Sequence, residues 1–365
     1  MNPFYLGIMV CRVLTINQPT FGEKTFFKNL FLEGKKLGVP MYIFSPLDID
    51  WPKEMVKGYY LSETGWKEKV FPLPRVVYDR CFYPNQQVFK MYQPYVKRVK
   101  SHPSIKFLGF GLMGKWEVYE ILKTSQELSS WLPPSALYTN EKEMLKWLNQ
   151  YQSIILKPIS GSHGRGIIRL TTHTNNQYSL IGRTEKNEFF HCVMSDWRKT
   201  VQWINRFVNK RKYLVQPYLN LTNKDGNPFD VRILAQKNHK GEWTLTGMAV
   251  RCGQKGHLTS NLHGGGKAEE IEDFLNRNFP ENIVKKILWS IQRMVELLPP
   301  YLESHHGRLI ELGIDIGIEP NGQIWLLEVN SKPGRRVFQE IGNKEMQASS
   351  IRNPVKYARY LLERV

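Results

Sequence analysis

The sequence predicts a protein that combines an α/β region with antiparallel α+β regions, arranged in two or three lobes. Three observations lead to this fold class. Near the amino end, residues 5–44 alternate strand, helix and strand, as in a βαβ unit. Further along, residues 154–168 run from a strand through a glycine-rich loop into a second strand. Near the carboxyl end, residues 309–329 form two apolar segments separated by a tight-turn signal.

Composition limits the class of protein. The chain has 365 residues, of which 41% are hydrophobic and 12% aromatic, enough for a globular core. Its four cysteines are far apart and make no metal or redox spacing, which predicts reduced thiols in a cytoplasmic protein: Cys11, Cys81, Cys192 and Cys252. The apolar amino end lacks a basic leader and a cleavage site, so we expect a first strand there. No apolar run reaches membrane-spanning length.

The formal net charge is +18, which attracts nucleotides, acidic polymers, nucleic acid or anionic surfaces. The basic residues are scattered, with clusters at residues 97–100, 210–212 and 335–336. Neither a zinc spacing nor an aromatic RNA-binding signature accompanies them. We therefore expect an anionic substrate or scaffold as the partner, and no nucleic acid.

Residues 1–110 are predicted to form a small α/β lobe. A strand at residues 5–10 precedes an amphipathic helix at residues 21–37, which Gly38 ends as a cap before a strand at residues 39–44. A meander or hairpin over residues 56–70 and a strand at residues 75–78 follow. Three charged residues lie at predicted strand ends, where α/β sheets bind ligands, although most residues of this kind are simply solvated: Arg12, Asp79 and Arg80.

Two lysines stand near glycines. Residues 109–122 form a glycine-marked turn and a helix that begins at Lys115, where a lysine opposes the helix dipole unless it binds an anion or is merely exposed. The strand from Ile154 ends at Lys157, and a loop of small residues follows it: Ser160, Gly161, Ser162, Gly164 and Gly166. Glycines let backbone amides approach phosphate oxygens, and the lysine adds charge. The alternative is an ordinary glycine-rich hairpin with a solvated lysine.

The region that follows carries a proline hinge and two basic strands. We expect a strand at residues 136–139, helices at 141–151 and 194–208, and an edge strand at 185–191. A strand from Tyr213 then enters a hinge whose freed backbone groups can recognise an adenine edge: Gln216, Pro217, Tyr218 and Leu219. Strands at 229–236 and 243–251 bear Asp230, Arg232 and Arg251, and the polar loop at 260–266 contains Asn261 and His263. A helix at 281–298 has a core-packing stripe: Ile283, Ile287, Ile291 and Val295.

The predicted hairpin near the carboxyl end carries three oxygen-bearing side chains. Residues 320–322, Pro-Asn-Gly, give a strong hairpin signal. Asp315 interrupts the first strand, and Glu328 and Asn330 lie at the end of the second. A carboxylate in a buried strand is costly unless something neutralises it. Two carboxylates and an amide suit Mg²⁺, which shares its ligand shell with phosphates. The alternative is an edge hairpin whose acids face water.

In order and spacing, these features resemble the ATP-grasp superfamily of carboxylate–amine ligases over about residues 110–340. The motifs that carry the resemblance are IILKPISGSHGRG, FDVR, SNLHGGG and GIDI with LLEVNSKPG. Some of them are similar to the glutathione-synthetase and RimK-like branch, and GKWEVYEIL and LPPSALYT resemble the endospore-coat-associated YheC/YheD group. The resemblance implies an ATP-grasp fold, in which two α+β subdomains (residues 111–219 and 220–365) clamp ATP behind an α/β domain (residues 1–110).

The resemblance also implies roles for residues. Lys115 and Lys157 would contact the α- and β-phosphates, with Lys123 competing for the place of Lys115. Residues 160–166 would close over the β- and γ-phosphates, and residues 216–219 would hold adenine, although Gln216 stands where many relatives have an acid. Asp315, Glu328 and Asn330 would hold one or two Mg²⁺ ions. Arg232 and Arg251 would stabilise the transferring phosphoryl group, and Asn261 and His263 would line the acceptor side.

Two functions follow from the resemblance. The first is an ATP- and Mg²⁺-dependent ligase that forms an amide or peptide bond through an acyl phosphate, linked to sporulation or the spore coat. Its partners would be a carboxylate and an amine, such as an acidic peptide, a cell-wall precursor or a spore-coat protein. The second is a coat-associated structural protein with an ATP-grasp fold that binds ATP with little or no ligase activity.

Overall fold

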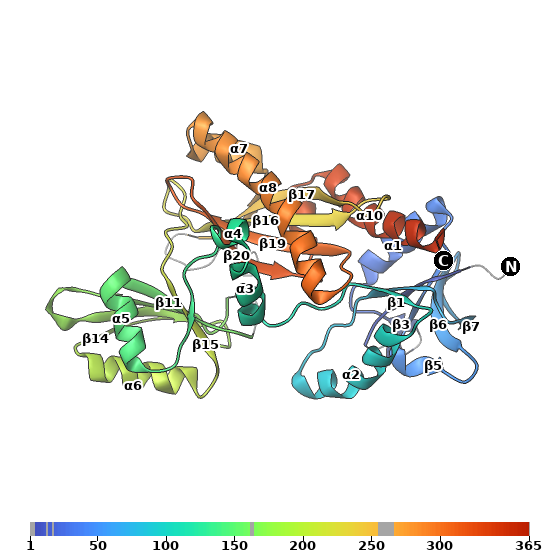
Figure 1. Ribbon diagram of the computed structural model, residues 1–365, viewed down its shortest axis with the longest axis horizontal. Coiled ribbons are helices and arrows are strands. Elements are labelled where there is room, and N and C mark those ends of the chain that lie inside the picture. Colours follow the sequence, from blue (N-terminus) through green and yellow to red (C-terminus); the bar gives the residue numbers. More distant parts are fainter. Residues whose placement is uncertain (1–3, 12–13, 17, 161–163, 255–265, 365) are drawn as a thin grey trace.

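Three large sheets organise the molecule. The computed structural model describes residues 4–11, 14–16, 18–160, 164–254 and 266–364. Each large sheet supports one of three lobes, which we name the amino-terminal, central and carboxy-terminal lobes (Figure 1). A separate small hairpin pairs β2 (Leu14–Ile16) with β3 (Gln18–Thr20). In the part of the chain that the structure describes, no helix combines the length and the apolar character needed to cross a membrane.

The amino-terminal lobe contains the predicted βαβ unit. Its strand order is β5-β6-β4-β1-β8-β9, with β7 paired to β6, and β1 runs parallel to both β4 and β8. Gly38 ends the first helix with a φ of 67°, which confirms the predicted cap. The elements are β1 (Leu6–Met9), α1 (Lys24–Leu37), β4 (Met41–Phe44), η1 (Pro46–Asp48), β5 (Ile49–Asp50), β6 (Met55–Ser62), β7 (Gly65–Pro72), β8 (Val76–Asp79), α2 (Gln86–Ser101) and β9 (Lys106–Leu108).

The central lobe is an antiparallel sheet in the order β10-β15-β11-β12-β13-β14. Two helices bury apolar residues against it, including Leu148 and Ile204. Residues 185–188 form a turn, so the edge strand lies at 189–194 and pairs with a strand that we did not predict. The elements are β10 (Ala136–Leu137), α5 (Glu141–Tyr151), β11 (Ser153–Pro158), β12 (Ile168–Thr172), η2 (Thr174–Asn176), β13 (Tyr178–Arg183), β14 (Phe189–Met194), α6 (Trp197–Val208) and β15 (Tyr213–Pro217).

The carboxy-terminal lobe is an antiparallel sheet in the order β18-β17-β16-β19-β20. Its helices α3 and α4 come from residues before the central lobe and share the same core. The elements are α3 (Lys115–Lys123), α4 (Gln126–Ser129), β16 (Phe229–Lys237), β17 (Trp243–Cys252), β18 (Lys267–Glu269), α7 (Ile271–Asn278), α8 (Glu281–His306), β19 (Glu311–Ile318), β20 (Ile324–Asn330), α9 (Arg336–Glu340) and α10 (Lys344–Leu362).

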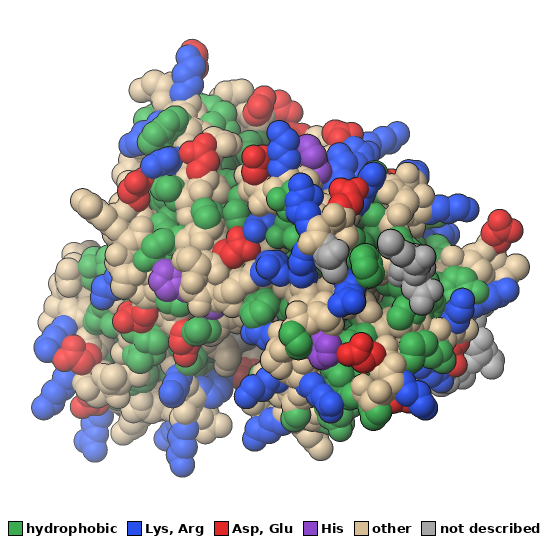
Figure 2. Space-filling model, turned by 45° about the vertical axis from the view of Figure 1, so that its right-hand side comes forward, with side chains coloured by type: hydrophobic (Ala, Val, Ile, Leu, Met, Phe, Trp, Pro, Cys, Tyr) green, Lys and Arg blue, Asp and Glu red, His purple; other side chains and the backbone are tan. Residues whose placement is uncertain are grey.

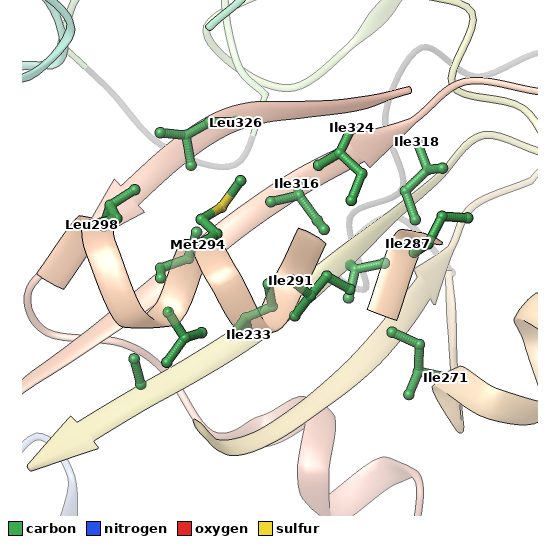
Figure 3. Packing of buried hydrophobic residues seen from close by; sticks show 14 of the residues in the cluster. Ile233, Ile271, Ile287, Ile291, Met294, Leu298, Ile316, Ile318, Ile324 and Leu326 are labelled. Atoms are coloured by element: carbon green, nitrogen blue, oxygen red, sulfur yellow. The ribbon is translucent and has the colours of Figure 1, made fainter. Parts of the chain in front are cut away.

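Helix α8 supplies the main core of this lobe. Ile287, Ile291 and Met294 face the apolar side chains of the sheet (Figure 3), which confirms the predicted core stripe. Ile283 of that stripe is only partly buried. The helix also continues to His306, beyond its predicted end at residue 298, because Pro299 and Pro300 are accommodated inside it.

Helix α10 joins two lobes. Its residues Val355 and Leu361 belong to the same buried cluster as Phe27 and Leu30 of α1. It also contacts β16 and β17 of the carboxy-terminal sheet. In Figure 1 it lies beside α1, between the two lobes. The last helix of the chain therefore packs the amino-terminal lobe onto the carboxy-terminal sheet.

Candidate functional site

A network of alternating charges crosses three neighbouring strands of the carboxy-terminal sheet. Sheet register places Asp230 of β16 opposite Arg251 of β17, and Arg232 of β16 opposite Asp315 of β19. Arg251 Nε donates to Asp230 Oδ1 at 2.6 Å, and its Nη2 lies 3.0 Å from Asp315 Oδ2. Arg232 donates two hydrogen bonds to Asp315, from Nε to Oδ1 and from Nη2 to Oδ2, the second at 2.9 Å. Two arginines therefore converge on one buried carboxylate.

Asp315 is ionised in this setting. Burial alone would raise its pKa, but Arg232 and Arg251 together hold the pKa of Asp315 below its ordinary value. An ionised, desolvated carboxylate is a strong ligand for a hard cation. The side chain lies in the interior of the sheet, so the alternative of a water-facing acid does not apply to Asp315, which is 6% exposed.

A β-bulge sets the second carboxylate opposite the first. From the turn, β19 and β20 pair regularly up to Ile316 and Leu326. If that register continued, Leu327 would lie opposite Asp315. The strand instead contains one extra residue, and Glu328 is the partner of Asp315. Asn330 follows two residues later, opposite Gly313, so Glu328 and Asn330 share a face of the strand.

Two lysines approach this pair of acids from other lobes and elements. Lys115 Nζ, at the start of α3, lies 3.5 Å from Glu328 Oε1. Burial and the charge of Lys115 lower the pKa of Lys157 to about 8, although Glu328 opposes that shift. Lys123 is exposed at the other end of α3. The structure thus brings Lys115 to Glu328 and leaves Lys123 away from it.

The described part of the glycine loop has the backbone that glycine favours. Gly164 and Gly166 have φ values of 69° and 70°. A Cβ on Gly166 would also stand 3.1 Å from the hydroxyl of Tyr213. Ser160 is exposed at the start of the loop, directly after β11. Gly161, Ser162 and His163 lie outside the described residues.

One backbone N–H of the hinge has no hydrogen-bond acceptor among the described residues. The N–H of Tyr218 donates to the Ser153 carbonyl at 2.9 Å, so it is already used. Gln216 Nε2 donates to Ser135 Oγ at 2.6 Å, which fixes this buried amide. Among the described residues, none accepts a hydrogen bond from the N–H of Leu219, whereas its carbonyl accepts from Leu221 at 3.0 Å. In this hinge, adenine recognition would fall to the Leu219 amide.

A loop of five residues after β20 (331–335, called the clamp loop) joins the site to the amino-terminal lobe. Lys332 Nζ donates to Asp79 Oδ2 and to the Cys81 carbonyl, both at 2.8 Å. Asp79 lies at the end of β8, as predicted, and it is occupied by this lysine. Sequence reasoning missed Lys332, because its partner Asp79 lies 253 residues away along the chain. Its place two residues after Asn330 is the one signal in the sequence that could have indicated it.

Arg80, also predicted at a strand end, is part of a buried network rather than a solvated surface. Its guanidinium is fully buried and pairs with Glu23 and Glu311. Glu311 lies on β19, four residues before Asp315 and on the same face of the strand. Arg335 of the clamp loop completes the pairing of Glu311. Arg12, Asn261 and His263 fall outside the described residues.

The donor set fits Mg²⁺ only together with a second source of oxygens. In the described ranges, no three His, Cys, Asp or Glu side chains gather as a metal cluster. Asp315 and Glu328 are paired across the strands, and Asn330 adds an amide oxygen nearby in the register. If these two carboxylates and one amide held Mg²⁺, phosphates and water would supply the oxygens that the protein does not.

Comparisons with known proteins agree with one another. A family model described as YheC/D-like ATP-grasp matches residues 104–361. The endospore coat-associated protein YheC of Bacillus subtilis (strain 168) is 31% identical over 343 residues, 93% of each chain. The endospore coat-associated protein YheD of the same strain is 27% identical over 354 residues, 96% of this chain and 77% of YheD.

Solved structures share the fold at low sequence identity. The D-cycloserine synthetase DcsG has a TM-score of 0.54 at 11% identity, and covers 98% of this chain and 99% of its own. The ATP-grasp ligase PsnB, complexed with minimal precursor, Mg and ADP, has a TM-score of 0.52 at 12% identity, and covers 96% and 98%. These likenesses confirm the predicted ATP-grasp fold, with mixed α and β structure in several sheets.

Proposed function

Because the chain belongs to the YheC/D-like ATP-grasp family, we propose that it is an ATP- and Mg²⁺-dependent ligase that joins a carboxylate to an amine. One observation carries this proposal. Arg232 and Arg251 converge on Asp315, and Asp315 stands opposite Glu328 in a bulged pair of strands. This arrangement concentrates positive charge and anionic oxygen at one place, as transfer of a phosphoryl group between two anions requires.

In the proposal, the nucleotide lies between the central and carboxy-terminal lobes. Lys115 and Lys157 contact its phosphates, with Ser160, Gly164 and Gly166 beside them. The pKa of Lys157, lowered to about 8 without a ligand, supports this role, because an arriving phosphate would supply the negative charge that the lysine lacks. The N–H of Leu219 recognises the adenine edge, within the hinge that Gln216, Pro217 and Tyr218 shape.

The proposed reaction has two steps. A substrate carboxylate oxygen attacks the γ-phosphorus of ATP, and the bond to the β-phosphate oxygen breaks, which releases ADP and leaves an acyl phosphate. The amine then attacks the acyl carbon, phosphate leaves with the bonding electrons, and a proton is lost from nitrogen. Arg232 and Arg251 stay fixed by Asp230 and Asp315, and their positive charge stabilises the transferring group.

Asp315, Glu328 and Asn330 would hold Mg²⁺, which would supply positive charge to offset that of the phosphates. The residues of the chain position the reactants and exclude water, so that the acyl phosphate is not hydrolysed. Asn261 and His263 stay candidates for the acceptor side. An acidic peptide, a cell-wall precursor or a coat protein remains the proposed source of the carboxylate or amine.

The direct test is binding followed by turnover. A ligand that binds only the folded state raises its thermal stability in a concentration-dependent way. We expect millimolar MgATP to raise the melting temperature, and ADP release to appear when pooled carboxylates and amines are added. Mass spectrometry then identifies the product. A melting temperature that does not change with MgATP would contradict the proposal.

Glu328→Gln tests the metal assignment. The substitution removes one negative charge but keeps the shape of the side chain, so the fold should survive. We expect ADP release to fall by at least about a hundredfold, the range seen when a group that stabilises the transition state is lost. The exposed Glu363→Gln on the surface pair with Arg359 is the control. Unchanged ADP release in Glu328→Gln would disprove the metal role.

A second candidate is a coat-associated protein that binds ATP without ligase activity. The names of the two Bacillus subtilis relatives favour it, because both are described as endospore coat-associated. The two proposals make different predictions in one experiment. A melting temperature that rises with MgATP, without ADP release from any substrate pool, would favour the second candidate.

A further inference from the structure

One long stretch of the chain contains no acidic residue. From Arg80 to Trp116 there is no Asp or Glu, while seven residues are Lys or Arg. The two ends of the stretch contact acidic residues of the carboxy-terminal sheet. Arg80 belongs to the buried network with Glu311, and Lys115 approaches Glu328. Helix α2, between them, is the part that faces solvent.

Helix α2 uses only one side for packing. Its buried and half-buried residues recur at helical spacing, at Val88, Tyr92, Val96 and Val99. Lys90 and Lys97, seven residues apart, lie on the opposite side and are exposed. Met91, Tyr95 and Arg98 form a flanking row at spacings of four and three residues. We call these five residues the α2 face.

The α2 face combines unpaired cations with exposed apolar surface. Among the described residues, no acidic side chain lies within ion-pair distance of Lys90, Lys97 or Arg98. Met91 is 52% exposed and Tyr95 is 43% exposed, which is high for such side chains. Arg98 is held in place by the ring of Trp51, 4.3 Å from its guanidinium carbon.

Acidic groups near α2 do not neutralise this face. Asp48 lies on η1, which packs against the helix. Burial raises the pKa of Tyr92, which lies on the buried side of the helix, and the charge of Asp48 adds to that rise. Glu54 Oε1 lies 3.8 Å from Nε2 of His102, the residue that follows the carboxyl end of the helix. The positive charges of the α2 face therefore remain exposed to solvent and are not neutralised by these acids. Figure 2 shows Lys and Arg side chains gathered along the lower part of the molecule, on both sides of a hollow between two lobes.

We propose that the α2 face is a docking surface for an acidic polypeptide. Tyr, Met and Arg are the residue types enriched in the cores of protein interfaces, and a rim of lysines steers an acidic partner toward them. A partner with Glu or Asp beside apolar residues matches both features. The phosphates of a nucleic acid would use the cations and its bases would stack on Tyr95, but Met91 would have no role. The surface does not depend on the ligase proposal, because docking needs no nucleotide.

The test is a binding measurement without ATP. A fluorescent Glu-rich peptide that also contains Leu is titrated with the full chain, and its anisotropy gives Kd at low and physiological salt. In Lys90→Gln/Lys97→Gln, we expect Kd to rise about fivefold, since each lost cation removes a modest, salt-dependent attraction. In Met91→Ser/Tyr95→Ser, we expect a similar loss that salt does not remove, because its origin is apolar burial.

The matched control is Lys142→Gln/Lys186→Gln. These two lysines are exposed on the central lobe, without an acidic partner in the described chain, so the control removes the same net charge elsewhere. An unchanged Kd in the control supports a localised surface. Equal losses in both lysine pairs, or no measurable peptide binding by the unaltered protein, would overturn the proposal. A single-stranded oligonucleotide that binds more tightly than the peptide through Lys90 and Lys97 would replace it with a nucleic-acid site.

Discussion

At the scale of single residues, Lys157 has an unfavourable position that an anionic ligand would relieve. It lies at the end of β11, half-buried, with Lys115 close enough to lower its pKa further. Glu328 compensates in part and is shared with Lys115. A lysine kept in such a place weakens the ligand-free fold. This is expected where a residue serves binding rather than stability.

We predict that Lys157→Met stabilises the ligand-free protein by about 1–3 kcal/mol at pH 7, because it removes a partly desolvated charge. The gain should shrink as pH rises. The pKa of Lys157 is about 8 when folded, against an ordinary value of 10.5, so the unfolded chain binds more protons between these values. The free energy of unfolding of the unaltered protein therefore rises with pH between these two pKa values and approaches that of the Lys157→Met variant.

Chemical unfolding at pH 7 and pH 10.5 measures this difference. The same variant should lose the rise in melting temperature caused by MgATP, because a phosphate contact is gone. Lys123→Met, at the exposed end of α3, is the control and should leave both quantities unchanged. A destabilised Lys157→Met at pH 7 would mean that the lysine contributes to the fold instead.

Some of the site was predictable at this scale and some was not. Asp315, Glu328 and the two arginines stand out because charged residues interrupt apolar strands. Lys332 and Glu311 do not stand out, because each finds its partner more than two hundred residues away, at Asp79 and Arg80. The open amide of Leu219 also needed the structure, since a neighbouring strand takes the amide of Tyr218.

At the scale of elements, the clamp loop crosses β19 at a position without a side chain. Gly313 lies between Glu311 and Asp315 on one face of the strand. A Cβ placed there would be 2.7 Å from the Cβ of Pro333. The loop can therefore lie flat on the strand. On either side of the proline, Lys332 donates to Asp79 and Arg335 donates to the Tyr78 hydroxyl, both in the amino-terminal lobe.

Gly313→Ala should consequently destabilise the protein by about 1–3 kcal/mol, the usual cost of forcing extra atoms into a packed place. It should also weaken the MgATP effect on the melting temperature, because displacement of the loop moves the end of β20. Thermal and chemical unfolding provide the measurement. Gly334→Ala in the same loop is the control, since a Cβ there would meet nothing within 4 Å. Equal stability of the two variants would show that Pro333 moves aside freely.

Most strands were predicted, because apolar, β-branched runs between turn residues are visible in the sequence. Helices α2 and α10 were not predicted. Each contains a proline, Pro94 or Pro354, which normally indicates a helix end. Pro354 is buried, and packing of α10 between two lobes compensates for the lost hydrogen bond. The bulge at Asp315 was equally hidden, because register depends on the partner strand.

At the scale of the whole molecule, a buried carboxylate holds two lobes together. Glu311 of the carboxy-terminal sheet is fully buried and accepts hydrogen bonds from four side chains: Tyr78, Arg80, Gln236 and Arg335. Tyr78 lies in β8 of the amino-terminal lobe, and Arg80 directly follows that strand. Burial raises the pKa of Tyr78 well above its ordinary value, so its hydroxyl stays a donor.

Removing the charge of Glu311 should destabilise the molecule strongly. In Glu311→Gln, Arg335 and the buried Arg80 lose a counter-charge, while Arg80 keeps its pair with Glu23. Breaking a buried ion pair on one side costs about 3–5 kcal/mol. We expect a lower melting temperature and faster proteolysis between the lobes. Glu340→Gln, in an exposed pair with Arg336, should change the melting temperature very little. A similar effect in both variants would contradict the special role of Glu311.

The position of Glu311 has a consequence for how the protein opens. Glu311 and Asp315 lie on one face of β19. The same strand therefore carries the ion pair with Arg80 of the amino-terminal lobe and the candidate metal ligand. Probes placed on these two lobes should keep a constant separation when MgATP is added. A probe on the central lobe should approach both of them. Access for nucleotide would then depend on one moving part, and a substrate bound to the amino-terminal lobe would already be at its working distance from the phosphates.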